Sequence, residues 1–306
     1  MSDRRIGIVV VHWRGMVDTR ECLESLTHLD QPGGDVIVVT NGPGDFDEAA
    51  ARDACPGITV IASETNGGYA AGCNIGARAA IARGAEIVLL LNNDTTVAPD
   101  LASKLASALD AHPRVGIAGP VVAYYDDPGL IWSAGGTLRR TLGYTRHVLF
   151  RSRRRPSVDA QVDYVSGCAI AMRREVFEQA GGLDERYFHY SEDLDICERA
   201  RGFGYQSMTV AAASVRHKIS AAAGERGSNR LNARQSYYFT RNRMVFIRRN
   251  GHGVRRWTAL VSQAALLFPY EIAKAILARN WREVRGRALG LIDGVRGRDG
   301  QRDVAP

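Results

Sequence analysis

The chain has 306 residues, of which 45% are hydrophobic and 24% charged, and it carries a formal net charge of +7. This composition is ordinary for a soluble globular protein and excludes a chain that is disordered as a whole. Residues 1–213 hold 21 Lys and Arg against 27 Asp and Glu, a balance of −6, whereas residues 214–306 hold 19 against 6, a balance of +13. We therefore expect the C-terminal third to meet an anionic partner: phosphate groups, nucleic acid or a membrane surface.

Short apolar, β-branched runs alternate with helical patterns in the first third of the chain. Strands are expected at 6–13, 36–41, 58–62 and 86–94, and helices at 18–29, 68–84 and 99–112. This alternation predicts a parallel sheet with helices on both faces. The apolar run at the N-terminus, residues 6–11, has no small-residue cleavage site after it, so it indicates a first strand and not a signal peptide.

The pattern changes after residue 120. Residues 135–150 are typical of an antiparallel hairpin, 162–172 of a strand and 173–180 of a short helix, and helices are expected from about residue 229 onward. The most apolar of these is 258–278. It contains Gln263, Pro269, Glu271 and Lys274, which favours a helix lying on a membrane surface over one that spans the membrane. A solvated helix bundle or an oligomer interface explains these basic helices almost as well.

The five cysteines are odd in number, widely spaced and without a C-x-x-C pair. This arrangement indicates neither a disulfide framework nor a zinc site, and it fits a reducing cytoplasm.

Three glycines, Gly68, Gly72 and Gly76, recur at four-residue spacing in TNGGYAAGCNIGARAA. On a helix they share one face, where either another backbone or a flat ligand can approach closely. The segment lacks the G-x-G-x-x-G pattern, which weakens a dinucleotide-binding interpretation. A tightly packed helix without a ligand explains the glycines equally well.

The segment VLLLNND begins as an apolar strand and ends in three polar residues, Asn92, Asn93 and Asp94. The carboxyl ends of strands in open α/β sheets deliver ligand-binding groups, although an ordinary polar turn has the same composition. Mg²⁺ or Mn²⁺ on a nucleotide diphosphate needs only one or two protein ligands, because water and phosphate oxygens supply the rest.

A second acidic cluster, Glu192, Asp193 and Asp195, begins an expected helix. Glu192 and Asp195 share a side of that helix, Asp195 also lies four residues before Arg199, and Asp193 points elsewhere. Neighbouring aromatic residues offer an environment that tunes a general base, while an acidic first turn favoured by the helix dipole is the simpler explanation. His217 is open to either a structural or a ligating role.

Together these segments resemble the family 2 glycosyltransferases, and within them a rhamnosyltransferase-like branch. The matching pieces lie between about residues 6 and 250 and include VVVHWRGMVDTRECLESL, VIVVTNGPGD, LLLNNDTTVAPD, VSGCAIAMRREVFEQAGGLDERYFHYSEDLDICERARGFGY and YYFTRNRMVFIRRNG. The resemblance implies an α/β fold of the GT-A class, Rossmann-like, with a mixed central sheet. We expect a catalytic domain at 1–228, divided into a nucleotide-sugar-binding half (1–120) and an acceptor-binding half (121–228), and a basic helical extension at 229–306.

The resemblance also implies roles for particular residues. Asp94 would hold a divalent metal, Mg²⁺ or Mn²⁺, with His217 as a further ligand. Asp193 would be the catalytic base and Glu192 its orienter or an acceptor ligand. The residues expected to bind the nucleotide sugar are His12, Trp13, Asn41, Asn66, Gly67, Asn74, Asn92 and Asn93.

Two positions depart from the family pattern. N-N-D stands where many relatives have D-x-D, so one carboxylate is available and metal affinity is expected to be modest. Thr40 stands where relatives usually have an Asp that reads the base, and Asn41 is the candidate to take over its hydrogen bonds.

The expected activity is inverting, metal-dependent transfer of a sugar from a nucleoside-diphosphate sugar to a hydroxyl acceptor. Rhamnose is expected through the branch resemblance alone. The acceptor is expected to be a lipid-linked cell-wall or polysaccharide precursor, reached by a cytoplasmic protein on the inner face of the cell membrane; a homo-oligomer is left open. A small natural product is the alternative acceptor.

Two alternatives come from other classes of protein. A nucleotidyltransferase needs a glycine-rich phosphate loop, which residues 12–20 lack. A nucleic-acid-binding protein needs exposed aromatic residues among its basic ones, whereas Tyr237, Tyr238, Phe239 and Phe246 follow a helical pattern typical of a core, so no nucleic acid is expected as a partner.

Overall fold

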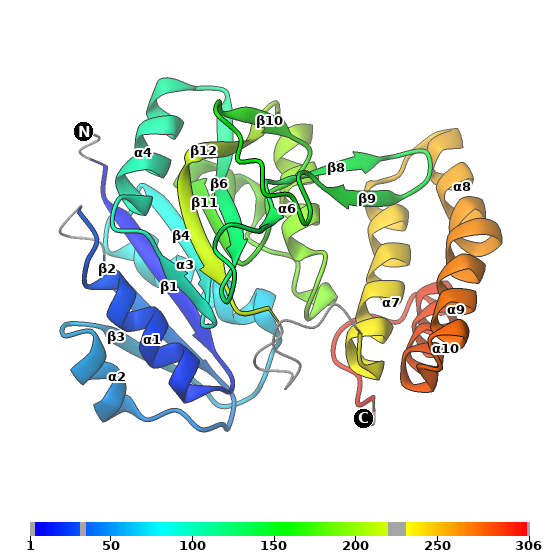
Figure 1. The fold of residues 1–306 in the computed structure, drawn as a ribbon, viewed down its shortest axis with the longest axis horizontal. Coiled ribbons are helices and arrows are strands. Elements are labelled where there is room, and N and C mark those ends of the chain that lie inside the picture. The colour runs from blue at the N-terminus through cyan, green and yellow to red at the C-terminus, as the bar shows by residue number, and fades with distance from the viewer. Residues whose placement is uncertain (1–3, 31–34, 220–230, 305–306) are drawn as a thin grey trace.

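The computed structural model describes residues 4–30, 35–219 and 231–304. A central sheet with helices packed on it forms one end of the molecule, and a group of helices from the last part of the chain forms the other (Figure 1). A two-stranded hairpin reaches from the sheet toward these C-terminal helices.

The first half of the sheet is parallel, with strand order β3-β2-β1-β4. This confirms the predicted alternation of strands and helices. The elements are β1 (Ile6–His12), α1 (Met16–Leu26), β2 (Asp35–Asn41), α2 (Glu48–Ala54), β3 (Thr59–Ser63), α3 (Tyr69–Ala82), β4 (Ile87–Asn92), β5 (Thr95–Val97) and α4 (Leu101–Ala111).

The second half makes the sheet mixed. The order continues β4-β11-β6-β12-β10, and β11 is antiparallel to both of its neighbours, so β6 and β12 run in the same direction as β4. β5 pairs with β12, and β7 pairs with β6. The bounds are β6 (Val115–Tyr124), β7 (Ile131–Ser133), β10 (Ala160–Val162), β11 (Ala169–Arg173), α5 (Arg174–Ala180), η1 (Glu185–Tyr187), α6 (Glu192–Gly202) and β12 (Gln206–His217).

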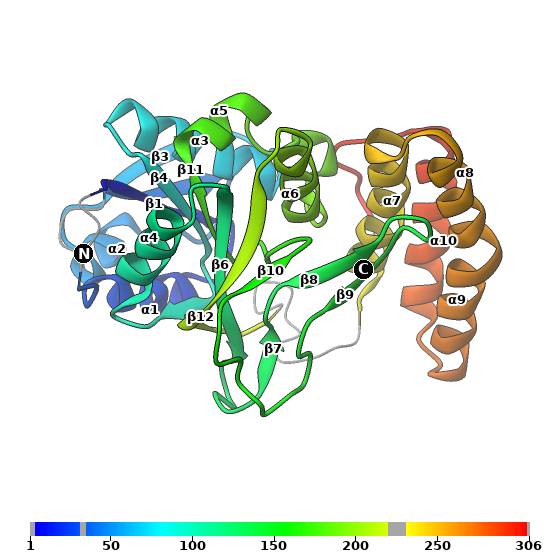
Figure 2. The same cartoon turned by 90° about the horizontal axis from the view of Figure 1, so that it is seen from above.

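Alternating side chains of the central strands feed two separate cores. On β1, Ile8 and Val10 pack with α1, α2 and α4, whereas Val9 and Val11 pack with α3, α5 and α6. Figure 2 shows α1 and α4 on one side of the sheet and α3, α5 and α6 on the other. Because both faces are covered, the strands are apolar throughout.

One expected strand, 162–172, is wrong as a continuous element. The chain instead forms β10, which pairs with β12, and β11, which lies between β4 and β6. A single straight strand cannot pair in both places, so residues 163–168 leave the sheet between them. The break exposes the backbone N–H of Gly167, which binds the Asp193 carboxylate.

The expected hairpin and C-terminal helices are present. The hairpin is β8 (Gly136–Arg139) and β9 (Tyr144–His147), and the helices are α7 (Ala233–Asn250), α8 (Gly253–Ser262), the π-helical turn η3 (Gln263–Leu267), α9 (Phe268–Leu277) and α10 (Trp281–Arg296). α10 packs so closely against α7 that a Cβ atom at Gly286 or Gly290 would collide with backbone carbonyl groups of α7. Tyr237 and Tyr238 of α7 are buried, as the helical pattern predicts.

The glycines of α3 serve packing against the sheet. A Cβ atom at Gly72 would lie 2.6 Å from Val11 Cγ1, and one at Gly76 would overlap Val9 Cγ1 and approach Val39 Cγ2 to 3.1 Å. These two glycines therefore let α3 approach β1 and β2, which favours the packing explanation over a ligand at this face.

We expect Gly76→Ala to lower the free energy of unfolding by about 1–3 kcal/mol, because the added methyl group must displace β1 side chains. Chemical denaturation measures this change. Gly202→Ala is the matched control: Gly202 ends α6, and a methyl group added there would have nothing within 4 Å, so the variant should be neutral or stabilised by up to about 1 kcal/mol. Equal stability of the two variants would contradict the close approach of α3.

Candidate active site

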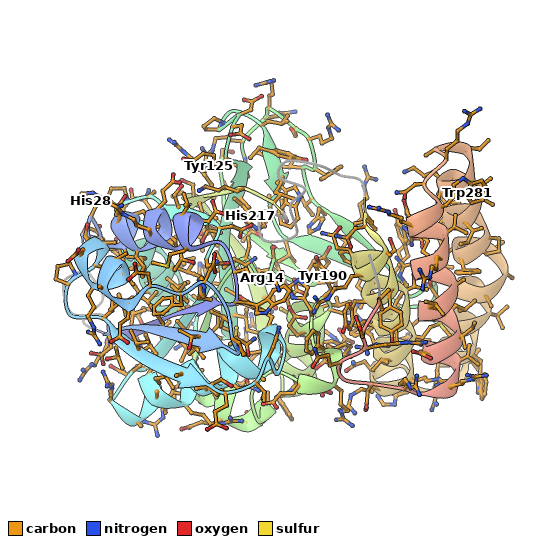
Figure 3. All side chains as sticks on the ribbon, turned by 90° about the horizontal axis from the view of Figure 1, so that it is seen from below. Arg14, His28, Tyr125, Tyr190, His217 and Trp281 are labelled. Atoms are coloured by element: carbon orange, nitrogen blue, oxygen red, sulfur yellow. The ribbon has the colours of Figure 1, made fainter. Side chains whose placement is uncertain are left out.

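One edge of the sheet collects the chemically interesting residues. The carboxyl ends of β1, β2, β4 and β12 lie there, together with the beginning of the antiparallel β11. A cavity of about 820 Å³ opens at this edge and extends to α7 and the start of α10. Arg14, Tyr190 and His217, which all line it, lie near the centre of Figure 3, between the sheet and the C-terminal helices.

Asp94 and His217 form a pair in this cavity. Asp94 follows β4, and the pairing of β5 with β12 places His217 opposite Thr95. Asp94 Oδ1 lies 3.0 Å from His217 Nε2, and both side chains are buried. His217 Nδ1 makes no hydrogen bond within the described part of the chain. The neighbouring backbone is also tied, since Lys218 N donates to Asp94 O at 3.0 Å.

The pair is a limited metal-binding set. Residues 4–30, 35–219 and 231–304 contain no group of three or more His, Cys, Asp or Glu side chains that could hold a metal ion. One carboxylate and one imidazole suit an ion that takes its other ligands from phosphate oxygens and water, as Mg²⁺ or Mn²⁺ on a nucleotide does. The residues thus fit a metal that arrives with its substrate.

Asn92 and Asn93 line the same cavity beside Asp94. Asn93 Nδ2 donates to Arg14 O at 3.0 Å and to Thr19 Oγ1 at 2.9 Å. These bonds join the turn after β4 to the loop after β1. Asn93 therefore shapes the edge on which Asp94 lies.

The acidic residues Glu192 and Asp193 lie at the start of α6 and line the cavity. Asp193 Oδ2 accepts a hydrogen bond from Gly167 N at 2.9 Å, and Oδ1 accepts one from Leu194 N at 2.8 Å. Gly167 lies in the break between β10 and β11, so the sheet irregularity holds the carboxylate. The expected pair of Asp195 with Arg199 is confirmed, with Arg199 Nε 2.6 Å from Asp195 Oδ2. The expectation that Glu192 shares a side with Asp195 is wrong, because Glu192 lines the cavity with Asp193 and Asp195 does not.

Burial gives the acid pair unusual proton affinities. Burial and then the charge of Asp193 raise the pKa of Glu192 to about 8. Burial also raises the pKa of Asp193, while its backbone hydrogen bonds oppose this shift. Because those bonds favour the ionised form of Asp193, the shared proton belongs on Glu192 at neutral pH. Glu192 Oε2 has no hydrogen-bond partner among the described residues.

A strained loop positions this pair. Phe188, Tyr190 and Ser191 have positive φ angles of 64°, 69° and 74°, a conformation that costs of order 1–3 kcal/mol for each non-glycine residue. Asn242 of α7 offsets this cost, since its Nδ2 lies 3.0, 2.8 and 2.7 Å from Tyr187 O, His189 O and Tyr190 O, and its two N–H groups are shared among these carbonyls.

Arg241 supports the same loop and is fully buried. Its Nη2 donates to Tyr187 O at 2.8 Å and to Arg186 O at 3.2 Å. Sequence reasoning missed Arg241 and Asn242 as supports of the site, because they lie far along the chain from the acids. Their signal was an adjacent Arg and Asn inside YYFTRNRMVF, the most aromatic and apolar stretch of α7.

The nucleotide-side predictions divide into two groups. Trp13 and Asn66 line the cavity, and the guanidinium carbons of Arg14 and Arg234 lie 4.7 and 4.9 Å from the Trp13 ring centroid. Asn41 also reaches the wall, but its Nδ2 donates to Gly68 O at 2.9 Å and its Oδ1 accepts from Gly67 N at 3.2 Å. Asn41 thus holds the 66–68 loop.

The second group of predicted nucleotide-binding residues lies behind the cavity wall. His12 is buried, with Nδ1 2.7 Å from Thr19 Oγ1 and Nε2 3.1 Å from Asp45 Oδ1. Asn74 bonds to Leu183 through both its amide nitrogen and its oxygen. Neither they nor Gly67 line the cavity, so a part in binding would come through the loops they hold.

Aromatic side chains that sequence reasoning did not select complete the wall. Trp132 contacts His217 edge-on, with centroids 5.3 Å apart, and Tyr190 stacks on Phe239 at 4.2 Å. All four line the cavity. Trp132 and Phe239 come from segments more than a hundred residues apart, which only the fold brings together.

The chain is similar to known glycosyltransferases in sequence. A model of glycosyl transferase family 2 matches residues 8–181. The chain is 28% identical over 295 residues to an N-acetylglucosaminyl-diphospho-decaprenol L-rhamnosyltransferase of Mycobacterium tuberculosis, covering 89% of this chain and 92% of that protein. It is 24% identical over 199 residues to the low-salt glycan biosynthesis hexosyltransferase Agl10 of Haloferax volcanii, covering 64% and 61%.

Two solved structures show the fold. A mannosyltransferase from Pyrobaculum calidifontis in complex with GDP-Man and Mn²⁺ superposes with a TM-score of 0.59 at 16% identity, covering 96% of this chain and 90% of that one. TarS 1–349 of S. aureus in complex with UDP-GlcNAc gives a TM-score of 0.59 at 16% identity, covering 96% and 81%. These likenesses, with the mixed sheet and C-terminal helices, confirm the expected GT-A fold.

The raised pKa of Glu192 predicts a pH-dependent stability. A folded pKa of about 8 against an ordinary value of 4.5 means that the stabilising contribution is complete below pH 4.5 and is lost as pH rises through 8. We expect the Tm of the parent to fall, relative to that of Glu192→Gln, between about pH 5 and pH 8.5, by the equivalent of a few kcal/mol. Thermal denaturation across this range measures it, and parallel curves for the two proteins would contradict it.

Proposed function

Since the chain belongs to glycosyl transferase family 2, we propose that it moves a sugar from a nucleoside-diphosphate donor to a hydroxyl group of a lipid-linked acceptor, with inversion at the anomeric carbon. The observation that carries this proposal is that Asp94, in the turn after β4, and Asp193, in the first turn of α6, line one cavity. A group that binds a diphosphate and a group that accepts a proton are the two that such a transfer needs.

Asp193 is proposed as the base. Its carboxylate would take the proton of the acceptor hydroxyl as that oxygen bonds to the anomeric carbon and the bond to the diphosphate breaks. The leaving group departs as a nucleoside diphosphate, so no covalent intermediate with the protein is required. Glu192 would keep its proton, which leaves a single negative charge on the pair and lets that charge reside on Asp193.

Asp94 and His217 are proposed to hold Mg²⁺ or Mn²⁺, with Asn92 and Asn93 beside them. The bound ion would supply positive charge to the departing diphosphate. Arg14 and Arg234 line the same cavity, and their guanidinium groups can add charge and hydrogen bonds to phosphate oxygens.

The donor nucleotide is proposed to contact Trp13 and Asn66. His12, Asn41, Gly67 and Asn74 would act through the loops that they hold, as their hydrogen bonds support. Relatives have a base-reading Asp where this chain has Thr40. Asn41 is poorly suited to replace that Asp, because its amide group already bonds to the backbone of Gly67 and Gly68. The identity of the base is therefore a question for a donor panel.

The sugar is proposed to be rhamnose, and the acceptor to be linked to a polyprenyl diphosphate. Both proposals rest on the similarity to the mycobacterial protein, which is named as a rhamnosyltransferase acting on a diphospho-decaprenol-linked substrate. Trp132, Tyr190 and Phe239 line the cavity, and their rings would offer flat apolar surfaces on which the C–H face of an acceptor sugar can pack. The acceptor would be reached from the cytoplasmic face of the membrane.

The reaction is tested by measuring nucleoside diphosphate release over a panel of UDP-, dTDP- and GDP-sugars with Mn²⁺ and a prenyl diphosphate-linked acceptor. With the best donor, we expect Asp193→Asn to lower kcat by at least about 100-fold, because the amide cannot take the proton. Glu192→Gln should cost less than about tenfold at neutral pH, since Gln resembles protonated Glu. Turnover of Asp193→Asn like that of the parent, or a larger loss in Glu192→Gln, would refute the assignment.

Asp94→Ala should weaken Mn²⁺-dependent donor binding by at least about tenfold, because the carboxylate would be the one charged protein ligand of the ion. Calorimetric titration with nucleoside diphosphate, with and without Mn²⁺, reads this without catalysis. Asp53→Ala, on the exposed side of α2, is the control and should bind like the parent. A titration of Asp94→Ala that matches the parent would show the metal position to be wrong.

A further inference from the structure

The outer helix of the C-terminal group has its polarity reversed. α8, η3 and α9 run without interruption from Gly253 to Leu277, a segment long and apolar enough by composition to cross a membrane. A surface helix of a soluble protein normally turns its apolar side toward the core. Here large apolar side chains point to solvent: Trp257 is 66% exposed, Val261 62%, Leu266 63% and Tyr270 66%.

The polar residues of the same helix point inward. Gln263 is 3% exposed, and its Nε2 donates to Leu142 O at 2.8 Å and to Gly143 O at 3.0 Å. Glu271 accepts from Arg243 of α7 at 3.1 Å and pairs with Arg287 of α10. The exposed apolar side is thus not a loosely attached core face, because polar bonds fix the helix in this orientation.

Basic residues lie at both ends of the apolar side. Arg255 precedes it, and Lys274, Arg279 and Arg282 follow it, all exposed. Between residues 257 and 273 the only charged residue is the inward-facing Glu271. In Figure 2, α8 and α9 lie at the end of the molecule farthest from the N-terminal strands, so this face is open to a large flat partner.

We propose that the outer face of α8–η3–α9 docks on a membrane surface that contains anionic lipid, with the helix axis in the plane of the interface. Trp257, Tyr270 and the nearby Trp281 suit the headgroup boundary, where amphipathic rings are enriched. The flanking Arg and Lys side chains suit anionic headgroups. The apolar residues between them would enter the acyl boundary.

The inward contacts exclude a spanning arrangement. Spanning would separate Glu271 from Arg243 and Arg287 and leave charged groups in hydrocarbon, a cost of several kcal/mol. A second copy of the chain fits the face less well than lipid, because residues 214–306 carry a balance of +13 and two such ends would repel each other.

The docking face lies close to the cavity. Gly143, whose carbonyl accepts from Gln263, lines the cavity, as do Arg243 and Arg282. The proposed docking deepens the proposed function and rests on it in one respect: the docked surface would present the lipid-linked acceptor to the cavity. Docking itself depends only on the exposed apolar side chains and the basic residues that flank them.

Flotation with vesicles of equal parts phosphatidylglycerol and phosphatidylcholine tests the proposal with the full-length protein. We expect the parent to bind, and the double variant Val261→Glu/Leu266→Glu to bind at least about tenfold more weakly, because two carboxylates would enter the acyl boundary. Val158→Glu, at a 71% exposed valine just before β10, is the matched control and should bind like the parent. Absence of parental binding, or equal loss in the control, would overturn the proposal.

Depth and activity separate the remaining outcomes. Brominated lipids should quench Trp257 and Trp281 at the same shallow depth, each signal being identified with its Trp→Phe variant; deep quenching of either would indicate spanning and overturn the flat arrangement. If light scattering shows a dimer that Val261→Glu/Leu266→Glu dissociates, while vesicles do not bind, the face is a subunit interface and the proposal is wrong. Nucleoside diphosphate release by the double variant with a detergent-solubilised acceptor should equal that of the parent, so failure of docking is distinguishable from failure of the proposed reaction.

Discussion

The arrangement around the cavity depends on keeping two adjacent carboxyl groups, of Glu192 and Asp193, largely out of water with one proton between them. Burial alone would neutralise both. Backbone N–H groups of Gly167 and Leu194 keep the charge on Asp193, and a loop of left-handed residues turns α6 so that the pair faces the cavity. That loop persists because α7 binds its carbonyl groups, and the side-chain amide of Asn242 shares its two N–H groups among three of them.

The sheet contributes by bringing distant strand ends to one edge. β1, β4 and β12 run in the same direction, so the segments after them converge, and Asp94 meets His217 there although more than a hundred residues separate them. The antiparallel β11 enters between β4 and β6 from that same edge. The chain must leave the sheet just before it, and the backbone freed at Gly167 binds Asp193. The irregularity of the sheet and the position of the acid are therefore one feature.

The C-terminal helices connect this site to the outer surface. On one side of α7, Arg241 and Asn242 bind the strained loop that precedes α6. On another side, Arg243 binds Glu271 of the outer helix. Because Glu271 and Gln263 are held inward, large apolar residues of the same helix, among them Trp257, Val261 and Leu266, face outward. Polar contacts thus determine the orientation of an apolar surface, the reverse of the usual relation in a soluble protein.

The sequence by itself determined the parallel half of the sheet, the hairpin and the C-terminal helices, because hydrophobic periodicity and β-branched runs are local signals. Asp94, Asp193 and His217 were open to structural explanations one at a time, and only the resemblance of the whole motif order to a family selected them as site residues. Only the tertiary structure decided which asparagines face the cavity and which, like Asn74, hold loops, because an amide's role depends on neighbours distant in sequence. It likewise split the strand expected at 162–172 and turned the apolar side of residues 253–277 outward: pairing partners and the polar contacts of Gln263 and Glu271 come from other segments, and no local pattern contains them.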